Sequence, residues 1–217
     1  MIESWLPLQL AEEVPHIAAV ARCPGWENEP TAALDAFREL VSLRMPRSVG
    51  DDFVTRESLV RRGSPPGIAH VHSSAQLHPG TWLLGDVLVA AGCELGPNAV
   101  VFGPTIVGPG TYLGPNAEVR RSLLLEDVVA SHACYIGHSI VGRRANIGAY
   151  FVTAVRNVKR RTVHVQLDGQ LIDTGYLHFG SLIGDDTQFG CGVTVMPGRM
   201  VLHTPFVPPG SLVSRNA

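Results

Sequence analysis

The chain of 217 residues has little cysteine, few aromatic residues and no long hydrophobic run. Its four cysteines are far apart and form no Cys-x-x-Cys pair, which predicts reduced thiols rather than a disulfide framework. No apolar stretch approaches the ~20 residues that span a bilayer. The first five residues, MIESW, lack the basic start of a signal peptide. We therefore expect a cytoplasmic protein that acts without a membrane.

An excess of charge of one sign is also absent. The chain has 17 Lys and Arg against 19 Asp and Glu, a net charge of -2. Electrostatics therefore give no reason to expect a nucleic-acid partner, and any phosphate binding must come from a local basic cluster. Glycine and proline are abundant instead, with 23 and 16 residues. That balance favours a repetitive β structure with many tight turns.

The middle of the chain has an aliphatic residue at every sixth position. The series runs Leu95, Val101, Val107, Leu113, Val119 and Leu125. The tetrapeptide GPNA at 96–99 recurs at 114–117, eighteen residues or three hexads later. Such hexads supply a short strand and a corner, with the aliphatic residue inside and Gly, Pro and Asn at the corners. The spacing predicts an all-β, three-sided parallel β-helix; a β-sandwich would show turn signals every 8–12 residues.

The repeat also predicts the division of the chain. It begins near residue 67, slips twice by one residue, breaks from about 152 to 178 and then continues to the end. We predict a β-helix over 67–217 with an ordered excursion loop at about 152–178, which contains a hairpin around Asp168-Gly169.

Residues 1–66 carry a different, helical pattern. A helix is predicted over about 32–45, with Thr31 as N-cap and Pro46 as its stop, and an earlier one over about 8–22, interrupted at Pro15. We expect this N-terminal segment to be a small helical cap over the unpaired edge of the first coil. It contains no Gly-rich nucleotide-binding loop.

The stretch SHACYIGHSIVGRRANIGA at 131–149 is more specific than the repeat. It resembles the C-terminal acetyltransferase domain of the bifunctional UDP-N-acetylglucosamine pyrophosphorylase/glucosamine-1-phosphate N-acetyltransferases and related sugar-1-phosphate nucleotidyltransferases. Their motif is His-x-x-Tyr-x-Gly-Asp-Ser-x-x-Gly-x-x-x-Asn-x-Gly-Ala-Gly-Thr. DTG at 173–175, SLIGD at 181–185 and MPG at 196–198 also match, so the resemblance covers about 70–213. It implies a left-handed coil, a homotrimer, acetyl-CoA as co-substrate and no metal.

The resemblance also implies roles for individual residues. His132 matches the family's general base, which accepts a proton from the sugar's amino group. Tyr135 and Asn146 match residues that line the sugar-phosphate pocket. Lys159 or Arg161 would supply the basic residue with which the excursion reaches the substrate phosphate.

The chain departs from the family motif after Asn146. The family's Gly-Ala-Gly-Thr reads GAYF at 148–151, and Val155 replaces a polar substrate contact. Tyr150 and Phe151 are candidates for core fillers, a platform for a sugar or base, or a trimer contact; we include Tyr150 among the substrate-binding residues.

Two functions follow from this pattern. One is an acetyl-CoA-dependent acyltransferase that acts on a phosphorylated or nucleotide-linked sugar. The other is a catalytically altered module that binds sugar nucleotides and partners a separate nucleotidyltransferase. A zinc site is disfavoured because His132 and His138 have the wrong spacing and no third ligand is evident.

Overall fold

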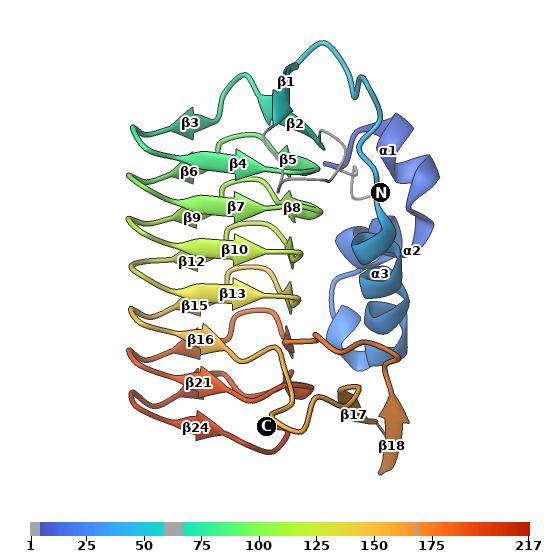
Figure 1. Ribbon diagram of the computed structural model, residues 1–217, viewed down its shortest axis with the longest axis vertical. Coiled ribbons are helices and arrows are strands. Elements are labelled where there is room, and N and C mark those ends of the chain that lie inside the picture. The colour runs from blue at the N-terminus through green and yellow to red at the C-terminus, as the bar shows by residue number, and fades with distance from the viewer. Residues whose placement is uncertain (1–4, 59–66, 168) are drawn as a thin grey trace.

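A computed structural model describes residues 5–58, 67–167 and 169–217. The chain forms a three-sided parallel β-helix with a left-handed winding, so the predicted fold class is confirmed (Figure 1). We call its three faces sheets A, B and C. Sheet A contains β2 (Gly67–His72), β5 (Val87–Val89), β8 (Thr105–Val107), β11 (Leu123–Leu124), β14 (Ile140–Val141), β19 (Ser181–Ile183) and β22 (Arg199–Val201).

The other two faces have seven strands each. Sheet B contains β4 (Trp82–Leu84), β7 (Val100–Phe102), β10 (Glu118–Arg120), β13 (Tyr135–Gly137), β16 (Val152–Thr153), β21 (Thr194–Val195) and β24 (Leu212–Val213). Sheet C contains β3 (Gln76–Leu77), β6 (Glu94–Leu95), β9 (Tyr112–Leu113), β12 (Val129–Ala130), β15 (Asn146–Ile147), β20 (Gln188–Phe189) and β23 (Phe206–Val207).

The stacking of equivalent residues builds the core. Leu95 lies beside Leu113 in the register of β6 and β9, eighteen residues on, and both are fully buried. Successive coils thus place aliphatic side chains one above another inside the prism, where burial of each contributes roughly 1.5–3 kcal/mol. The two one-residue slips fall at the corner between sheets B and A. There Arg121 and His138 adopt φ of 47° and 50°, and Ile106 pairs with Leu123 only seventeen residues on.

The N-terminal helices lie along the outer face of sheet A (Figure 1). They are α1 (Leu8–Glu13), α2 (Pro15–Arg22) and α3 (Pro30–Ser42), with the short 3-10 helix η1 (Trp26–Asn28) before α3. Pro15 separates α1 from α2, as predicted. Thr31 is not the N-cap of α3: Glu29 is, and the helix begins two residues earlier than predicted because Pro30 takes the first helical position, which suits its fixed φ and missing N–H. None of the helices in the described ranges has the length and hydrophobicity to cross a membrane.

The predicted helical cap over the first coil is not what the structure shows. A strand of the same segment, β1 (Phe53–Ser58), pairs antiparallel with β2 and covers the sheet A side of that edge. The helices cover a side of the prism because sheet A presents an outward row of apolar residues to them. That row contains Leu88, Ile106, Leu123, Ile140, Leu182 and Met200. The predicted division between residues 66 and 67 lies at the end of the segment 59–66, which is outside the described residues.

One arginine fastens the helices to the prism. Arg143, at the corner after β14, is buried and forms ion pairs with Glu126 at 3.0 Å and Asp185 at 3.4 Å. Its guanidinium also donates to the carbonyl oxygens of Val20, Ala21 and Cys23, at the C-terminal end of α2. Those carbonyls have no partner within the helix and attract a cation.

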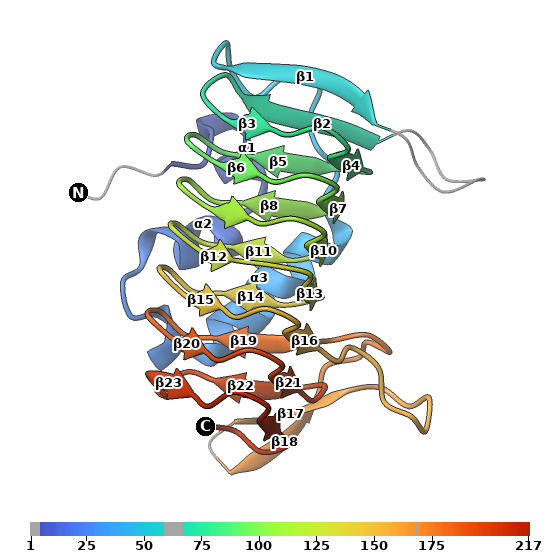
Figure 2. The same ribbon diagram turned by 90° about the vertical axis from the view of Figure 1, so that its left-hand side faces the viewer.

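The excursion leaves the prism after β16 and returns at β19. It carries the predicted hairpin, β17 (His164–Leu167) and β18 (Gln170–Asp173), which is antiparallel; Asp168 of its turn lies outside the described residues. Ile140 and Leu182, neighbours in sheet A, are 42 residues apart in the chain. Figure 2 shows the excursion projecting from the lower part of the prism, beside the last coils.

Candidate functional site

The excursion begins and ends near the corner between sheets B and A, and this corner gathers polar side chains. A ladder of buried hydroxyl groups supports it from inside. The backbone N–H of Ser122 donates to Thr105 Oγ1, that of Ser139 to Ser122 Oγ, and that of Ser181 to Ser139 Oγ, at 3.0–3.3 Å. The ladder runs unbroken across the excursion, so the corner before the loop and the strand after it form one structure.

Two imidazoles meet at this corner. His138, in the left-handed corner position, is only 6% exposed. His178, at the return of the excursion, stacks on it with ring centroids 5.4 Å apart and an angle of 27° between the planes. The return segment is fixed there because the backbone N–H of Gly180 donates to the carbonyl oxygen of His138 at 2.8 Å.

Arginines surround the imidazole pair. Burial, followed by the charges of Arg121, His178 and Arg120, lowers the pKa of His138 to about 3. Burial and then Arg156, Arg121 and Arg120 lower the pKa of His178. Both rings are therefore neutral at neutral pH, and each keeps one N–H donor. We call Arg120, Arg121, Arg156, His138 and His178 the cationic corner.

Tyr135 extends from sheet B toward this corner. A Cβ placed on Gly137 would lie 2.6 Å from the Tyr135 hydroxyl, so the ring lies across that glycine. Tyr135 is half-buried, and burial raises its pKa, partly offset by Arg120. Arg120 itself lies over the Phe102 ring, 4.1 Å from its centroid, and 3.6 Å from Glu118. A cation, a phenol and an aromatic ring therefore share the outer surface of sheet B.

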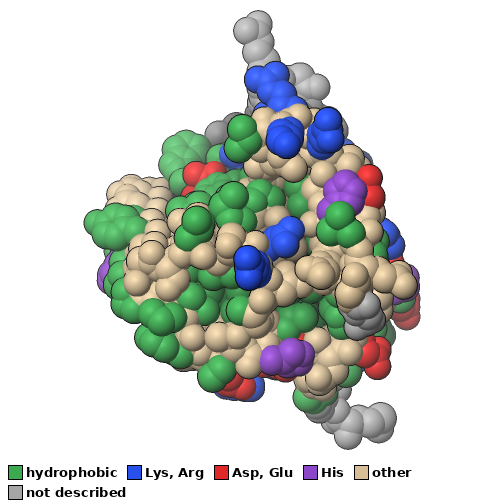
Figure 3. Space-filling view, turned by 90° about the horizontal axis from the view of Figure 1, so that it is seen from below, with side chains coloured by type: hydrophobic (Ala, Val, Ile, Leu, Met, Phe, Trp, Pro, Cys, Tyr) green, Lys and Arg blue, Asp and Glu red, His purple; other side chains and the backbone are tan. Residues whose placement is uncertain are grey.

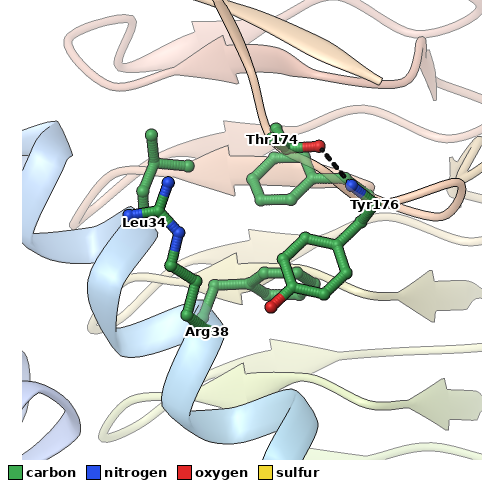
Figure 4. A pocket seen from close by; sticks show the side chains of 6 residues that line it. Leu34, Arg38, Thr174 and Tyr176 are labelled. Atoms are coloured by element: carbon green, nitrogen blue, oxygen red, sulfur yellow. Dashed lines mark hydrogen bonds between the residues drawn. The ribbon is translucent and has the colours of Figure 1, made fainter. Parts of the chain in front are cut away.

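Helix α3 holds the return of the excursion in place. Phe37 makes edge contacts with Tyr176 at 5.6 Å and Phe179 at 4.7 Å between centroids, on either side of His178 in the chain. Figure 4 shows Leu34 and Arg38 of α3 facing Thr174 and Tyr176 across a narrow crevice. The Tyr176 N–H donates to Thr174 Oγ1 at 3.2 Å. The N-terminal segment thus positions His178 without entering the site.

The predicted base lies at another edge of sheet B. His132 is exposed at the corner between sheets C and B. Tyr150 occupies the same corner one coil on: its N–H donates to the His132 carbonyl at 3.1 Å, and its side chain is 71% exposed. Phe151, in contrast, is fully buried inside the prism against Phe189. Of the two bulky residues, only Tyr150 reaches the surface.

The other predicted residues are spread over the surface. Asn146 lies on sheet C, in register with Val129 and Gln188 and half-buried. Lys159 and Arg161 are exposed in the first part of the excursion, between Arg156 and the hairpin. Within one chain, Tyr135 is the predicted residue that lies beside the cationic corner.

Sequence reasoning missed most of the cationic corner. The sequence motif brings up His138 only as a possible zinc ligand and singles out neither Arg120 nor Arg121. The adjacent arginines directly before a slip in the hexad period are a signal that could have pointed to them. No local signal places His178 beside His138, since forty residues of chain separate the two.

Metal ligands and reactive thiols are not part of this site. Within 5–58, 67–167 and 169–217, no three His, Cys, Asp or Glu side chains lie close enough to hold a metal ion. Cys134, next to His132 and Tyr135 in sequence, is buried, and burial raises the pKa of its thiol to about 12. That thiol is therefore a core group rather than a nucleophile.

Comparison with known proteins decides the family. The profile of the family described as GMPPB C-terminal domain matches residues 83–207, more than half of the chain. The chain belongs to this family. The match covers most of the β-helix and both ends of the excursion, and it confirms the resemblance to sugar-1-phosphate nucleotidyltransferases found in the sequence.

Curated relatives match a shorter part. The chain is 29% identical over 99 residues to a bifunctional sugar-1-phosphate nucleotidylyltransferase/acetyltransferase of Sulfurisphaera tokodaii, covering 46% of this chain and 25% of that protein. It is 32% identical over 81 residues to the bifunctional protein GlmU of Methanococcus maripaludis, covering 37% of this chain and 20% of GlmU. It thus spans about a quarter of these relatives or less.

Solved structures are similar at lower identity. A hexapeptide transferase family protein from Anaplasma phagocytophilum aligns with 72% of this chain and 77% of its own at 18% identity, with a TM-score of 0.34. PerB from Caulobacter crescentus, solved with CoA and GDP-perosamine, aligns with 71% of this chain and 54% of its own at 19% identity, with a TM-score of 0.27.

Proposed function

We propose that this protein is an acyltransferase that acts on a phosphorylated or nucleotide-linked sugar. The cationic corner is the observation that carries the proposal. Three arginines and two neutral imidazoles share a corner at which Glu118 is the acidic neighbour, and Glu118 is already paired with Arg120. Such a corner suits a phosphate or diphosphate, which guanidinium groups bind through charge-assisted hydrogen bonds.

The sugar would lie across sheet B. Five residue steps separate His132 from Gly137, so at about 3.3 Å per step the two lie at most roughly 16 Å apart. A sugar that is anchored by its phosphate at the cationic corner would contact Tyr135, and its reactive group would extend toward His132. Lys159 and Arg161, which project from the excursion, would add charge contacts to the phosphate groups. Asn146 and Tyr150 would contribute from the neighbouring coil surface.

His132 would act as the general base. Its imidazole would accept the proton of the sugar's amino or hydroxyl group as that group attacks the thioester carbonyl of acetyl-CoA. The new C–N or C–O bond forms, the C–S bond breaks, and the departing CoA thiolate takes up the proton. The transfer is direct because the thiol of Cys134 is buried and its pKa is about 12.

A homotrimer would complete the site. Sheet A is covered by the chain's own helices, so sheets B and C are the faces left for contact with other copies. Exposed apolar side chains lie on these two sheets and at the corner between them, and such groups mark contact surfaces. They are Trp82, Val129, Tyr150, Val152, Phe206 and Leu212.

All four cysteines are free thiols, as fits a reducing cytoplasm.

Steady-state assays with acetyl-CoA and a panel of sugar phosphates and nucleotide sugars test the proposal. Release of free CoA should depend on the acceptor. His132→Ala should lower kcat at least a hundredfold, within the range for loss of a general base, while His203→Ala, another exposed histidine, should not. Arg120→Gln should raise KM for phosphorylated acceptors. Absence of both turnover and CoA binding by calorimetry would reject the enzyme.

Thermal unfolding of the wild-type protein in the presence of each ligand tests the second function. A sugar-nucleotide-binding module would be stabilised against thermal unfolding by nucleotide sugars and not by CoA. The structure weakens one argument for that module, since Phe151 lies in the core and does not obstruct the surface. Tyr150 and Val155 remain as departures from the family motif.

A further inference from the structure

A second cavity, of about 410 Å³, lies at the C-terminal end of the prism. Its walls come from four parts of the chain: η1 with the start of α3, strand β17, the end of β22 and the last residues. Six of the lining side chains define its chemistry: Glu27, Asn28, Gln166, Leu167, Met200 and Leu202. Figure 3 shows this end of the molecule from below; its densest group of Lys and Arg side chains lies toward one margin.

Hydrogen bonds hold the walls together. Asn216 accepts from the Met200 N–H at 3.0 Å and donates from its side-chain amide to the Gln166 carbonyl at 2.9 Å, so it joins β22 to the hairpin. The Leu202 N–H donates to the Ala217 carbonyl at 3.0 Å. The cavity is therefore largely pre-formed, and its volume lies in the range of small-molecule sites.

The lining combines an apolar surface with hydrogen-bond acceptors. Leu167 and Met200 are 5% and 2% exposed. Glu27, a half-buried residue, contributes its carboxylate to the lining. The Asn28 side-chain amide donates to the Gly25 carbonyl at 2.9 Å, which leaves its own oxygen free to accept. No Lys or Arg lines the cavity.

We propose that this cavity binds a small organic cation, an ammonium or guanidinium group on an apolar body. The carboxylate of Glu27 and the free oxygen of Asn28 would accept from the cationic head, and Leu167, Met200 and Leu202 would contact the apolar body. An anion is disfavoured because Glu27 supplies a carboxylate and no Lys or Arg lines the cavity, where His203 is the other titratable side chain. This site goes beyond the proposed acyl transfer and uses none of its residues.

Calorimetry and thermal shift with hexylammonium, 1-hexanol and hexanoate at neutral pH test the proposal on the full chain. Hexylammonium should bind and raise Tm, while the alcohol and the carboxylate of the same length should bind at least tenfold more weakly. Glu27→Gln should weaken hexylammonium binding at least tenfold. Glu29→Gln, an exposed neighbour outside the cavity, should leave it unchanged.

Leu202→Trp, which fills the cavity from a partly exposed position, should also abolish binding. Circular dichroism and Tm of each free variant report whether it has folded. The proposal is wrong if hexylammonium does not bind the wild type, if hexanol or hexanoate binds equally well, or if Glu27→Gln and Glu29→Gln behave alike. The binding assays contain no acyl donor, so failure of the cation site would leave the acyltransferase proposal standing. Failure of the acyltransferase assays would likewise leave the cation site standing.

Discussion

The imidazole of His178 stacks on that of His138 with 5.4 Å between centroids, although forty residues of chain separate them. The contact joins the return of the excursion to the corner between sheets B and A, where His138 has a left-handed backbone conformation. Burial first, and then the charges of nearby arginines, lower the pKa of both rings and keep them neutral at neutral pH.

The first prediction concerns acid stability. The pKa of His138 is about 3 in the folded protein, below the ordinary value of 6.5. Between these values the unfolded chain binds a proton that the folded chain does not, so stability falls as pH decreases from about 6.5 toward 3. His138→Asn should flatten this slope, measured by urea unfolding at several pH values. His132→Asn, at an exposed position, is the control; equal slopes for wild type and His138→Asn would contradict the prediction.

The second prediction links phosphate binding to protonation. A bound phosphate would offset the arginine charges that, after burial, help to lower the pKa of His178, so that pKa should rise and the complex should take up protons as it forms. Calorimetry with a sugar phosphate in two buffers of different ionisation enthalpy measures this uptake. His178→Gln should reduce it. A binding enthalpy that does not depend on the buffer would count against a phosphate at this corner.

The third prediction concerns Tyr135 and the glycine beneath it. A Cβ on Gly137 would lie 2.6 Å from the Tyr135 hydroxyl, so Gly137→Ala should displace the ring. We expect KM for the phosphorylated acceptor to rise about tenfold, which corresponds to about 1.4 kcal/mol. Tyr135→Ala should have a similar effect, and the double variant should be no worse than either, since both remove one contact. Additive effects would show that the glycine acts elsewhere.

The fourth prediction concerns the attachment of the helices. Arg143→Met removes a buried cation from Glu126, Asp185 and three carbonyls at the end of α2, and should cost about 3–5 kcal/mol of unfolding free energy. Arg144→Met, which breaks the exposed pair with Asp186, should cost about 0–1 kcal/mol. Chemical denaturation measures both. Similar losses in the two variants would mean that Arg143 does not fasten the helices.

The fifth prediction concerns α3 and the excursion. Phe37→Ala removes a fully buried ring from Tyr176 and Phe179 and should cost about 3–5 kcal/mol. Hydrogen exchange should increase most in residues 174–180, which rest on this ring. Phe206→Ala, at a 55% exposed position, is the matched control and should change stability little. Unchanged exchange in 174–180 would show that other contacts hold the excursion.

Sequence and structure agree where local periodicity decides the outcome. The hexads place Leu95 and Leu113 inside the prism, and Asp168-Gly169 predicts the hairpin that β17 and β18 form. The site was predictable only in part. Tyr135 lies beside the cationic corner, whereas His132 and Lys159 lie elsewhere on the surface of one chain. A motif identifies residues along the chain, but it does not say which of them meet in the folded chain.

The sequence by itself determined the prism, because a period of six with Gly, Pro and Asn at the corners allows few other ways to bury its aliphatic residues. It also determined the hairpin and the break at Pro15. Only the tertiary structure decided that the helices cover sheet A, that Phe151 points inward, and that His178 meets His138. These outcomes depend on packing between segments far apart in the chain, and residue spacing carries no record of such contacts.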